Sequence, residues 1–303
     1  MRAIRLAPSN QLVIEADVPQ PQAGKDELLI QVRAAGVIPT ELSWYPTTHK
    51  KNGEPRTGAI PTHEFSGVVA GGDCFPAGLE VFGMNDWFAD GAAAEFCVAP
   101  CAAVVAKPST LSHTEAASVP ISALTAWQGL FDRARLQKGE RVLVHGGAGA
   151  VGMFVVQLAR LHGARVTATA SAGDASFVRD LGADVLDYRT TRFDQQLRDL
   201  DVVFDTVGGE TLERSWAVLK PGGRMVTVVS TSEESRDPRV KQAFFIVEAK
   251  GEQLAAVADL LENGQLRTAV SAAVPLERAA EAFAGKAPKH APGKLVIEIQ
   301  VGS

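Results

Sequence analysis

The sequence is poor in cysteine and aromatic residues, and it has no excess of positive charge. Only three of its 303 residues are cysteine, so disulfides cannot be the main support of the fold, and a chain of this length buries a core without them. We therefore expect a reducing compartment, with the cytoplasm as the default location. The net charge of −5 at pH 7 gives no general attraction to phosphate backbones or anionic lipids, which argues against nucleic acid and membranes as partners.

Long apolar runs are also missing. No stretch approaches the roughly 18 apolar residues that a membrane-spanning helix requires. The first ten residues alternate apolar with polar or charged side chains, which is not the pattern of a signal peptide. Hydrophobic residues make up 46% and charged residues 21% of the chain, the proportions of an ordinary globular protein. At about 150 residues per domain, the length indicates two domains.

The two halves of the chain differ in their hydrophobic patterns. In the first half, short apolar runs separated by glycine and proline predict strands, and residues 45–61 show no regular period and are expected to form a long loop. From about residue 112, strand-like runs alternate with helical spacings, which predicts an α/β half with a parallel sheet and right-handed crossovers. The predicted strands are 12–14, 27–35, 65–70, 94–98, 141–145, 165–170, 201–205, 224–229 and 294–300, and the predicted helices are 151–158, 175–181, 212–219 and 254–261.

A glycine-rich turn carries the strongest chemical signal. Gly147, Gly149 and Gly152 follow the predicted strand 141–145 and open the predicted helix. In this context the first glycine permits a tight turn, the second lets the backbone approach a diphosphate, and the third lets helix and strand pack closely. The start of the helix then offers free N–H groups to the anion. The pattern predicts dinucleotide binding, and the alternative is a tight turn without a ligand.

The end of the next predicted strand bears on the choice of nicotinamide nucleotide. A carboxylate about 20 residues after the glycines binds the adenosine ribose 2′-hydroxyl and selects NAD. Ser171 stands at this position, and residues 169–173 are small or polar, which leaves room for a 2′-phosphate. Asp174 opposes this interpretation, because its charge repels a phosphate if the side chain points inward. We predict NADPH as the cofactor.

Several short motifs occur in a fixed order along almost the whole chain. They are AAGV at 34–37, HEFSGVV at 63–69, GAAAEF at 91–96, LTAW at 124–127, LGAD at 181–184, FDTVGG at 204–209, LKPGGR at 219–224 and GKLV at 293–296. With these motifs, and with the glycine-rich turn in its second half, the chain resembles the medium-chain dehydrogenase/reductase superfamily. More closely, it resembles the zinc-independent quinone oxidoreductase branch.

The resemblance implies an α/β architecture of two domains. A GroES-like, β-rich catalytic domain is expected over residues 1–110, completed by 252–303, and a Rossmann domain with a doubly wound parallel sheet is expected over 111–251. Relatives bind nicotinamide and substrate in a cleft between the domains and form homodimers through the edge strands of the Rossmann sheet. Tyr188 falls where relatives place a tyrosine against the 2′-phosphate, whereas Asp174 stands where many of them carry lysine. Together with the glycine pattern, the resemblance assigns cofactor binding to Thr125, Gly147, Ala148, Gly149, Ala150, Val151, Gly152, Ser171, Tyr188, Val207, Val229, Ser230 and Phe245.

This chain differs from the zinc-dependent members of the superfamily at the positions of the zinc ligands. Zinc-dependent members bind catalytic zinc through a cysteine after the AAGV segment, a histidine in a Gly-His-Glu motif, and a cysteine near the start of the Rossmann domain. Here the first position is Ile38, His63 is retained, and the third falls around residues 120–121, which are Pro and Ile. One histidine without thiolate partners does not make a tetrahedral site. We predict no metal, and we expect His63 to be a structural, hydrogen-bonded residue.

Without a metal, the expected chemistry is hydride transfer from NADPH to an acceptor that needs little activation. Quinones and α,β-unsaturated carbonyls qualify, because their product anions are delocalised. Tyr45 and Thr40 are the candidate catalytic residues, with Tyr45 as the proton donor, and the alternative is that Trp44 and Tyr45 form an aromatic pair over the core. Two other functions are kept open: an enoyl-thioester reductase, and a non-catalytic NADPH-binding redox sensor.

Overall fold

The computed structural model describes residues 1–9, 11–288 and 290–300. The chain divides into two compact units: unit 1 comprises Met1–Ile121 and Ala249–Ser303, and unit 2 comprises Ser122–Glu248. The sequence placed the corresponding boundaries at residues 110 and 251. The first division falls later because helix α2 (His113–Ala116) packs on the sheet of unit 1 and the N–H of Ile121 donates to buried Glu64 Oε2 at 2.9 Å.

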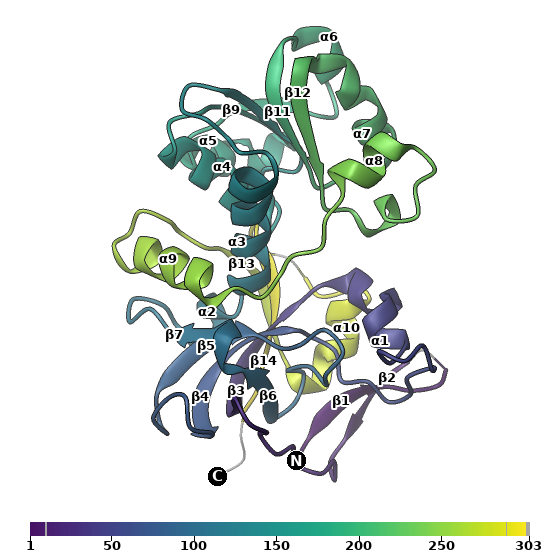
Figure 1. The fold of residues 1–303 in the computed structure, drawn as a ribbon, viewed down its shortest axis with the longest axis vertical. Helices are drawn as coiled ribbons and strands as arrows, with labels where there is room; N and C mark the ends of the chain where they lie inside the picture. The colour runs from purple at the N-terminus through teal and green to yellow at the C-terminus, as the bar shows by residue number, and fades with distance from the viewer. Residues whose placement is uncertain (10, 289, 301–303) are drawn as a thin grey trace. The chain divides into compact units, whose positions relative to one another are not determined.

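Unit 1 is built on a seven-stranded sheet with the order β13-β14-β3-β4-β5-β7, in which β6 also pairs with β3 (Figure 1). Its pairings are antiparallel except for β13 with β14, and β1 and β2 form a separate antiparallel pair. Side chains of β3 alternate between half-buried and buried along its first half, as expected for a strand with one face on the core. The strands of this unit are β1 (Ala3–Leu6), β2 (Leu12–Glu15), β3 (Glu27–Val37), β4 (Glu64–Gly71), β5 (Glu80–Met84), β6 (Phe96–Pro100), β7 (Val104–Ala106), β13 (Val270–Pro275) and β14 (Lys294–Glu298).

Seven helical segments accompany this sheet in unit 1, among the described residues. They are η1 (Pro39–Ser43), α1 (Tyr45–Thr48), η2 (Cys101–Ala103), α2, α9 (Gly251–Glu262), η7 (Leu276–Arg278) and α10 (Ala279–Phe283). The predicted loop 45–61 therefore contains a helical turn, α1. A tight turn follows it, since Lys50 N donates to Glu54 O at 2.8 Å and Arg56 N donates to Thr48 O at 2.8 Å. These backbone hydrogen bonds leave no periodic pattern of side chains, which is why the sequence did not predict them.

Cysteine pairing was not predicted from the sequence. Cys74 and Cys101 form a disulfide with a Cα–Cα separation of 6.1 Å, and Cys97 is free. Burial raises the pKa of the Cys97 thiol to about 12, so this thiol is not a nucleophile at neutral pH.

Unit 2 is a five-stranded sheet with the order β10-β9-β8-β11-β12, and all of its pairings are parallel (Figure 1). The chain starts in the central strand β8, moves outward to one side, and then returns to fill the other side. This doubly wound order confirms the predicted α/β fold and places a topological switch point at β8, where such sheets bind ligands at the carboxyl ends of their strands. The strands are β8 (Arg141–Val144), β9 (Arg165–Ala170), β10 (Asp184–Asp187), β11 (Leu200–Asp205) and β12 (Leu219–Thr227).

The helices of unit 2 differ in length from the predicted ones. They are α3 (Pro120–Trp127, which begins in unit 1), the π-helix η3 (Gln128–Arg133), α4 (Gly152–Leu161), η4 (Ala172–Asp174), α5 (Ala175–Asp180), α6 (Phe193–Gln196), α7 (Gly209–Ser215), η5 (Trp216–Val218), η6 (Ser230–Ser232) and α8 (Pro238–Ala243). The predicted helix 212–219 ends at residue 218, and β12 begins at Leu219 and runs through the Pro-Gly-Gly segment that was expected to precede it. A shift of register between Leu200 and Val202 accommodates these residues at the edge of the sheet.

Within the part of the chain that the structure describes, no helix combines the length and the hydropathy that crossing a bilayer requires.

Candidate functional site

The glycine-rich loop joins the central strand β8 to helix α4. Gly146 has a φ of 75°, Gly147 N donates to Thr169 O at 2.9 Å, and Gly149 N donates to Gly146 O at 2.9 Å. A Cβ atom on Gly147 would lie 2.8 Å from the Cβ of Ala168, and one on Gly152 would collide with Gly146 O. Both positions therefore require glycine for packing of the protein itself.

The outer side of this loop is open. Gly149 is exposed, and a Cβ atom there would meet only Gly146 O, at 3.2 Å. Helix α4 has no side-chain N-cap, and among the described residues the N–H groups of Ala150 and Val151 have no hydrogen-bond partner. Free N–H groups at the N-terminus of a ten-residue helix are the donors that a diphosphate needs. The loop, with half-buried Ala148, therefore fits the nucleotide that the sequence predicted.

The carboxyl ends of β9 and β10 bring together the residues predicted at the adenosine ribose. Tyr188 N donates to Ala170 O at 3.3 Å, which places Tyr188 beside Ser171. The Tyr188 side chain is 57% exposed, and the guanidinium of Arg189 lies 5.6 Å from the centre of its ring. Interaction with Tyr188, together with the charges of Asp187 and Asp174, raises the pKa of Arg189. The Arg189 guanidinium is thus held beside Tyr188 at this end of the sheet.

A hydrogen bond to Asp174 occupies the donor hydrogen of the Ser171 side chain. Ser171 Oγ donates to Asp174 Oδ2 at 2.7 Å and accepts from Asp174 N at 3.3 Å. The hydroxyl hydrogen of Ser171 is therefore already used, so this residue cannot donate to a 2′-phosphate without releasing Asp174. The sequence predicted Ser171 as a cofactor residue but did not predict this hydrogen bond.

The carboxyl ends of β11 and β12 carry further residues that were predicted to bind the cofactor. Asp205 accepts from Val207 N at 3.1 Å and from Thr227 Oγ1 at 2.8 Å, so it caps the turn after β11. This turn exposes 53% of Val207, and Val229 follows β12 on the adjacent segment. The remaining assigned residues lie on other elements of unit 2: Thr125 on α3, Ser230 at the start of η6, and Phe245 after α8 with Arg133 at 5.6 Å from its ring.

In unit 1, His63 is hydrogen-bonded through both ring nitrogens. Its Nδ1 lies 2.5 Å from Glu41 Oε1, and its Nε2 lies 3.3 Å from Ala89 O. Glu41 Oε1 also accepts from Thr62 N at 2.8 Å, and Glu41 and His63 are both buried. This is the structural environment that the sequence predicted for His63.

The donor set for a catalytic zinc ion does not fit. Ile38, and Pro120 and Ile121 around the third position, stand where zinc-dependent members of the superfamily carry cysteine, and their aliphatic side chains have no donor atom. Among the described residues, no group of three or more His, Cys, Asp and Glu side chains is arranged to bind a metal ion. The reaction proposed for this chain therefore includes no step on zinc.

Tyr45 and Thr40 are both exposed in unit 1. The Tyr45 side chain, 54% exposed, stacks on His49 with ring centres 4.5 Å apart. Trp44 is half-buried and packs edge-on against Trp87 at 5.6 Å. The two neighbours thus contact different aromatic side chains. The proton-donor role of Tyr45 and the catalytic assignment of Thr40 on η1 stay predictions.

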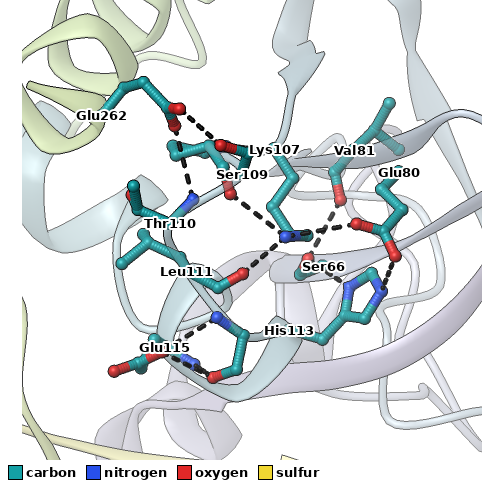
Figure 2. A network of polar contacts seen from close by, with 12 residues as sticks. Ser66, Glu80, Val81, Lys107, Ser109, Thr110, Leu111, His113, Glu115 and Glu262 are labelled. Carbon is teal, nitrogen blue, oxygen red and sulfur yellow. Dashed lines mark hydrogen bonds and ion pairs between the residues drawn. The ribbon is translucent and has the colours of Figure 1, made fainter.

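A second polar network of unit 1 resembles a hydrolase triad only in composition (Figure 2). His113 Nδ1 lies 2.8 Å from Ser66 Oγ and its Nε2 lies 3.3 Å from Glu80, which also pairs with Lys107 Nζ at 3.2 Å. Ser66 is fully buried on β4, so its hydroxyl cannot reach a substrate. Burial lowers the pKa of His113. The network links α2 and the segment after β7 to the sheet, and we assign it no catalytic role.

Two family matches cover parts of both units. Residues 24–109 match the family described as alcohol dehydrogenase GroES-like domain, and residues 181–297 match the family described as zinc-binding dehydrogenase.

Full-length relatives extend these matches along the chain. A probable mitochondrial zinc-binding oxidoreductase of Arthroderma benhamiae is 32% identical over 318 residues, which cover 96% of this chain and 94% of that protein. A 2-methylene-furan-3-one reductase of Solanum lycopersicum is 32% identical over 94% of this chain and 75% of its own length. Among solved structures, the quinone oxidoreductase of Coxiella burnetii is similar with a TM-score of 0.84 at 29% identity, over 99% of each chain.

Proposed function

The chain belongs to the medium-chain dehydrogenase/reductase superfamily, and from this premise we propose that it is an NADPH-dependent, zinc-independent reductase of quinones or α,β-unsaturated carbonyls. The observation that carries the proposal is the glycine loop, whose open side and free N–H groups at Ala150 and Val151 fit a dinucleotide diphosphate. The names of two similar proteins, a 2-methylene-furan-3-one reductase and a quinone oxidoreductase, support acceptors of this kind.

The residues of this chain would bind and orient the nucleotide rather than activate the acceptor. Bound NADPH supplies the hydride. The loop N–H groups hold the diphosphate, and Val207 and Val229 give the nicotinamide an apolar surface. Because Ile38, Pro120 and Ile121 offer no metal ligand, the acceptor must be one whose product anion is stabilised by its own delocalisation. Tyr45 is the proposed source of the proton.

The function is tested by following NADPH oxidation with a panel of quinones, enones and a crotonyl thioester. We expect turnover with at least one quinone or enone and none, or far less, with the thioester. Preferential reduction of the thioester would favour an enoyl-thioester reductase instead. Tight NADPH binding without turnover of any acceptor would favour a redox sensor.

The preference for NADPH is proposed to depend on Arg189. No carboxylate occupies the position of Ser171, and the guanidinium of Arg189 stands beside Tyr188 at the ribose end of the sheet. We predict that Arg189→Gln weakens NADPH binding about tenfold and leaves NADH binding unchanged, because only the 2′-phosphate needs the cation. The dissociation constants are measured by fluorescence titration.

Arg192→Gln is the matched control, since Arg192 is also exposed but pairs with Asp194 at 2.9 Å. Equal losses of NADPH affinity in both variants, or equal losses of NADPH and NADH affinity in Arg189→Gln, would refute the assignment. A wild-type protein that binds NADH more tightly than NADPH would refute the predicted cofactor itself. The cytoplasmic location and the homodimer stay predictions.

A further inference from the structure

His145 is buried between the central strand β8 and the glycine loop. Its side chain has no exposed surface and packs edge-on against Phe193, with ring centres 4.6 Å apart. Both ring nitrogens lie next to hydroxyl groups from other elements: Nε2 is 2.8 Å from Ser215 Oγ on α7, and Nδ1 is 3.3 Å from Thr169 Oγ1 on β9. The role of a fully buried imidazole with two hydroxyl partners, directly before the glycine loop, therefore has to be explained.

Only one assignment of donors and acceptors satisfies the hydrogen bonds around this ring. Ser215 Oγ donates to Thr211 O at 2.6 Å. Because a serine hydroxyl has a single hydrogen, Ser215 must accept from His145, and the imidazole hydrogen is therefore on Nε2. Nδ1 is then an acceptor for the Thr169 hydroxyl. Burial, with a contribution from the charge of Arg214, lowers the pKa of His145 to about 4, so the ring is neutral at pH 7 as this arrangement requires.

The same series of hydrogen bonds ends on the glycine loop. Thr169 Oγ1, which donates to His145, accepts from Gly146 N at 3.1 Å, and Thr169 O accepts from Gly147 N at 2.9 Å. Gly146 O in turn accepts from Gly149 N at 2.9 Å and is the atom against which Gly152 packs. Thr169 therefore anchors both peptide groups that flank Gly146: its hydroxyl holds the Gly146 N–H, and its carbonyl holds the Gly147 N–H, whose peptide carries Gly146 O. The first of these, the Gly146 peptide, depends on a correctly oriented Thr169 hydroxyl.

We propose that His145 is a positioning residue for the nucleotide: through Thr169 it fixes the Gly146 peptide, and thereby the open conformation of the diphosphate-binding loop. His145 need touch no atom of the cofactor, because its effect is transmitted by the Thr169 hydroxyl. This inference rests on the proposed function, since it concerns the loop to which NADPH is assigned.

The test compares NADPH dissociation constants among variants of the two residues. Thr169→Val keeps the shape of the side chain but removes the acceptor for Gly146 N, and we expect about tenfold weaker binding, equivalent to the loss of one well-formed hydrogen bond. His145→Leu should weaken binding to a similar extent, and the double variant should be no weaker than either single variant. Thr169→Ser should restore wild-type affinity. The turnover number at saturating NADPH should be unchanged, so that the loss appears in KM.

Thr167→Val is the matched control, because Thr167 lies two residues earlier on the same strand and has no contact with the loop among the hydrogen bonds described. Its NADPH affinity should equal that of the wild type. Should His145→Leu fail to fold, the Thr169→Val and Thr169→Ser pair still decides the question.

A second readout needs no cofactor. Nitrogen-15 NMR of the unliganded protein at pH 7 should show a neutral His145 protonated on Nε2, and exchange of the Gly146 amide hydrogen should be faster in Thr169→Val than in the wild type. A ring protonated on Nδ1, or unchanged NADPH affinity in Thr169→Val, would overturn the positioning role while leaving the proposed function intact. A wild-type protein that binds neither NADPH nor NADH would overturn both.

Discussion

Replacing Gly152 with alanine is expected to abolish detectable NADPH binding and to lower the midpoint of thermal unfolding. The added Cβ atom would collide with Gly146 O and would lie 2.8 Å from Gly146 C and 3.1 Å from Gly147 Cα. All three are backbone atoms, which cannot rotate away, so either α4 or the loop must move. We expect an affinity loss of at least about 100-fold, or roughly 2.7 kcal/mol, measured by fluorescence titration alongside thermal unfolding.

Gly149→Ala separates the effect on binding from the effect on packing. Its Cβ atom would meet only Gly146 O at 3.2 Å, so the unfolding midpoint should stay close to that of the wild type. NADPH binding should still weaken, because the methyl group stands where the backbone is proposed to approach the diphosphate. Wild-type affinity in both variants would show that the loop does not bind the nucleotide.

Replacing Lys294 with methionine is expected to lower the free energy of unfolding by about 3–5 kcal/mol at pH 7. The ammonium group of Lys294 pairs with Glu64 Oε1, and both side chains are buried. The other carboxylate oxygen, Oε2, accepts from Ile121 N at 2.9 Å. Without Lys294 the carboxylate stays in the core with no counter-charge, and the loss is measured by urea denaturation.

The loss should shrink as the pH falls. Burial raises the pKa of Glu64, and Lys294 opposes that rise, so in Lys294→Met the folded protein takes up a proton at a higher pH than the unfolded chain does. Stability then decreases as pH increases through this window, and the variant should be closer to the wild type at pH 5.5 than at pH 7.5.

Two controls test whether the buried charge is the cause. The double variant Glu64→Gln/Lys294→Met should recover much of the stability, because no isolated charge remains. Lys50→Met, which breaks the exposed pair of Lys50 with Glu54, should leave the unfolding free energy unchanged within error. A Lys294→Met deficit that is the same at both pH values would contradict the explanation.

The sequence predicted the central strands of unit 2 far better than the short strands of unit 1. β9 matches its predicted range, and β11 begins one residue earlier than predicted, because buried parallel strands form continuous runs of apolar and β-branched residues. β5 and β7, with five and three residues, are too short to leave such a run. Their positions depend on pairing with β4 and with each other, which no local pattern records.

The candidate site was predictable only where its constraints are local. Gly152 packs against Gly146 of the same turn, so the glycine spacing was informative. The His145 hydrogen bonds join residues 24 and 70 positions apart, and nothing in the spacing identifies such partners. The available signal was a histidine directly before the loop, at the end of a strand with an otherwise apolar core face. The hydrogen bond from Ser171 to Asp174 was missed because the orientation of Asp174 depends on the short helix η4.

Because of the disulfide between Cys74 and Cys101, the stability of the protein depends on whether it is kept under reducing or oxidising conditions. It closes a ring across 27 positions, and restricting the unfolded ensemble by a ring of that size contributes on the order of 3–4 kcal/mol in the loop-entropy description. Thiol reagents present during purification, or glutathione inside a cell, can reduce the disulfide and thereby remove this contribution to stability. Samples prepared with and without reductant are therefore chemically distinct species, and a melting temperature belongs to only one of them.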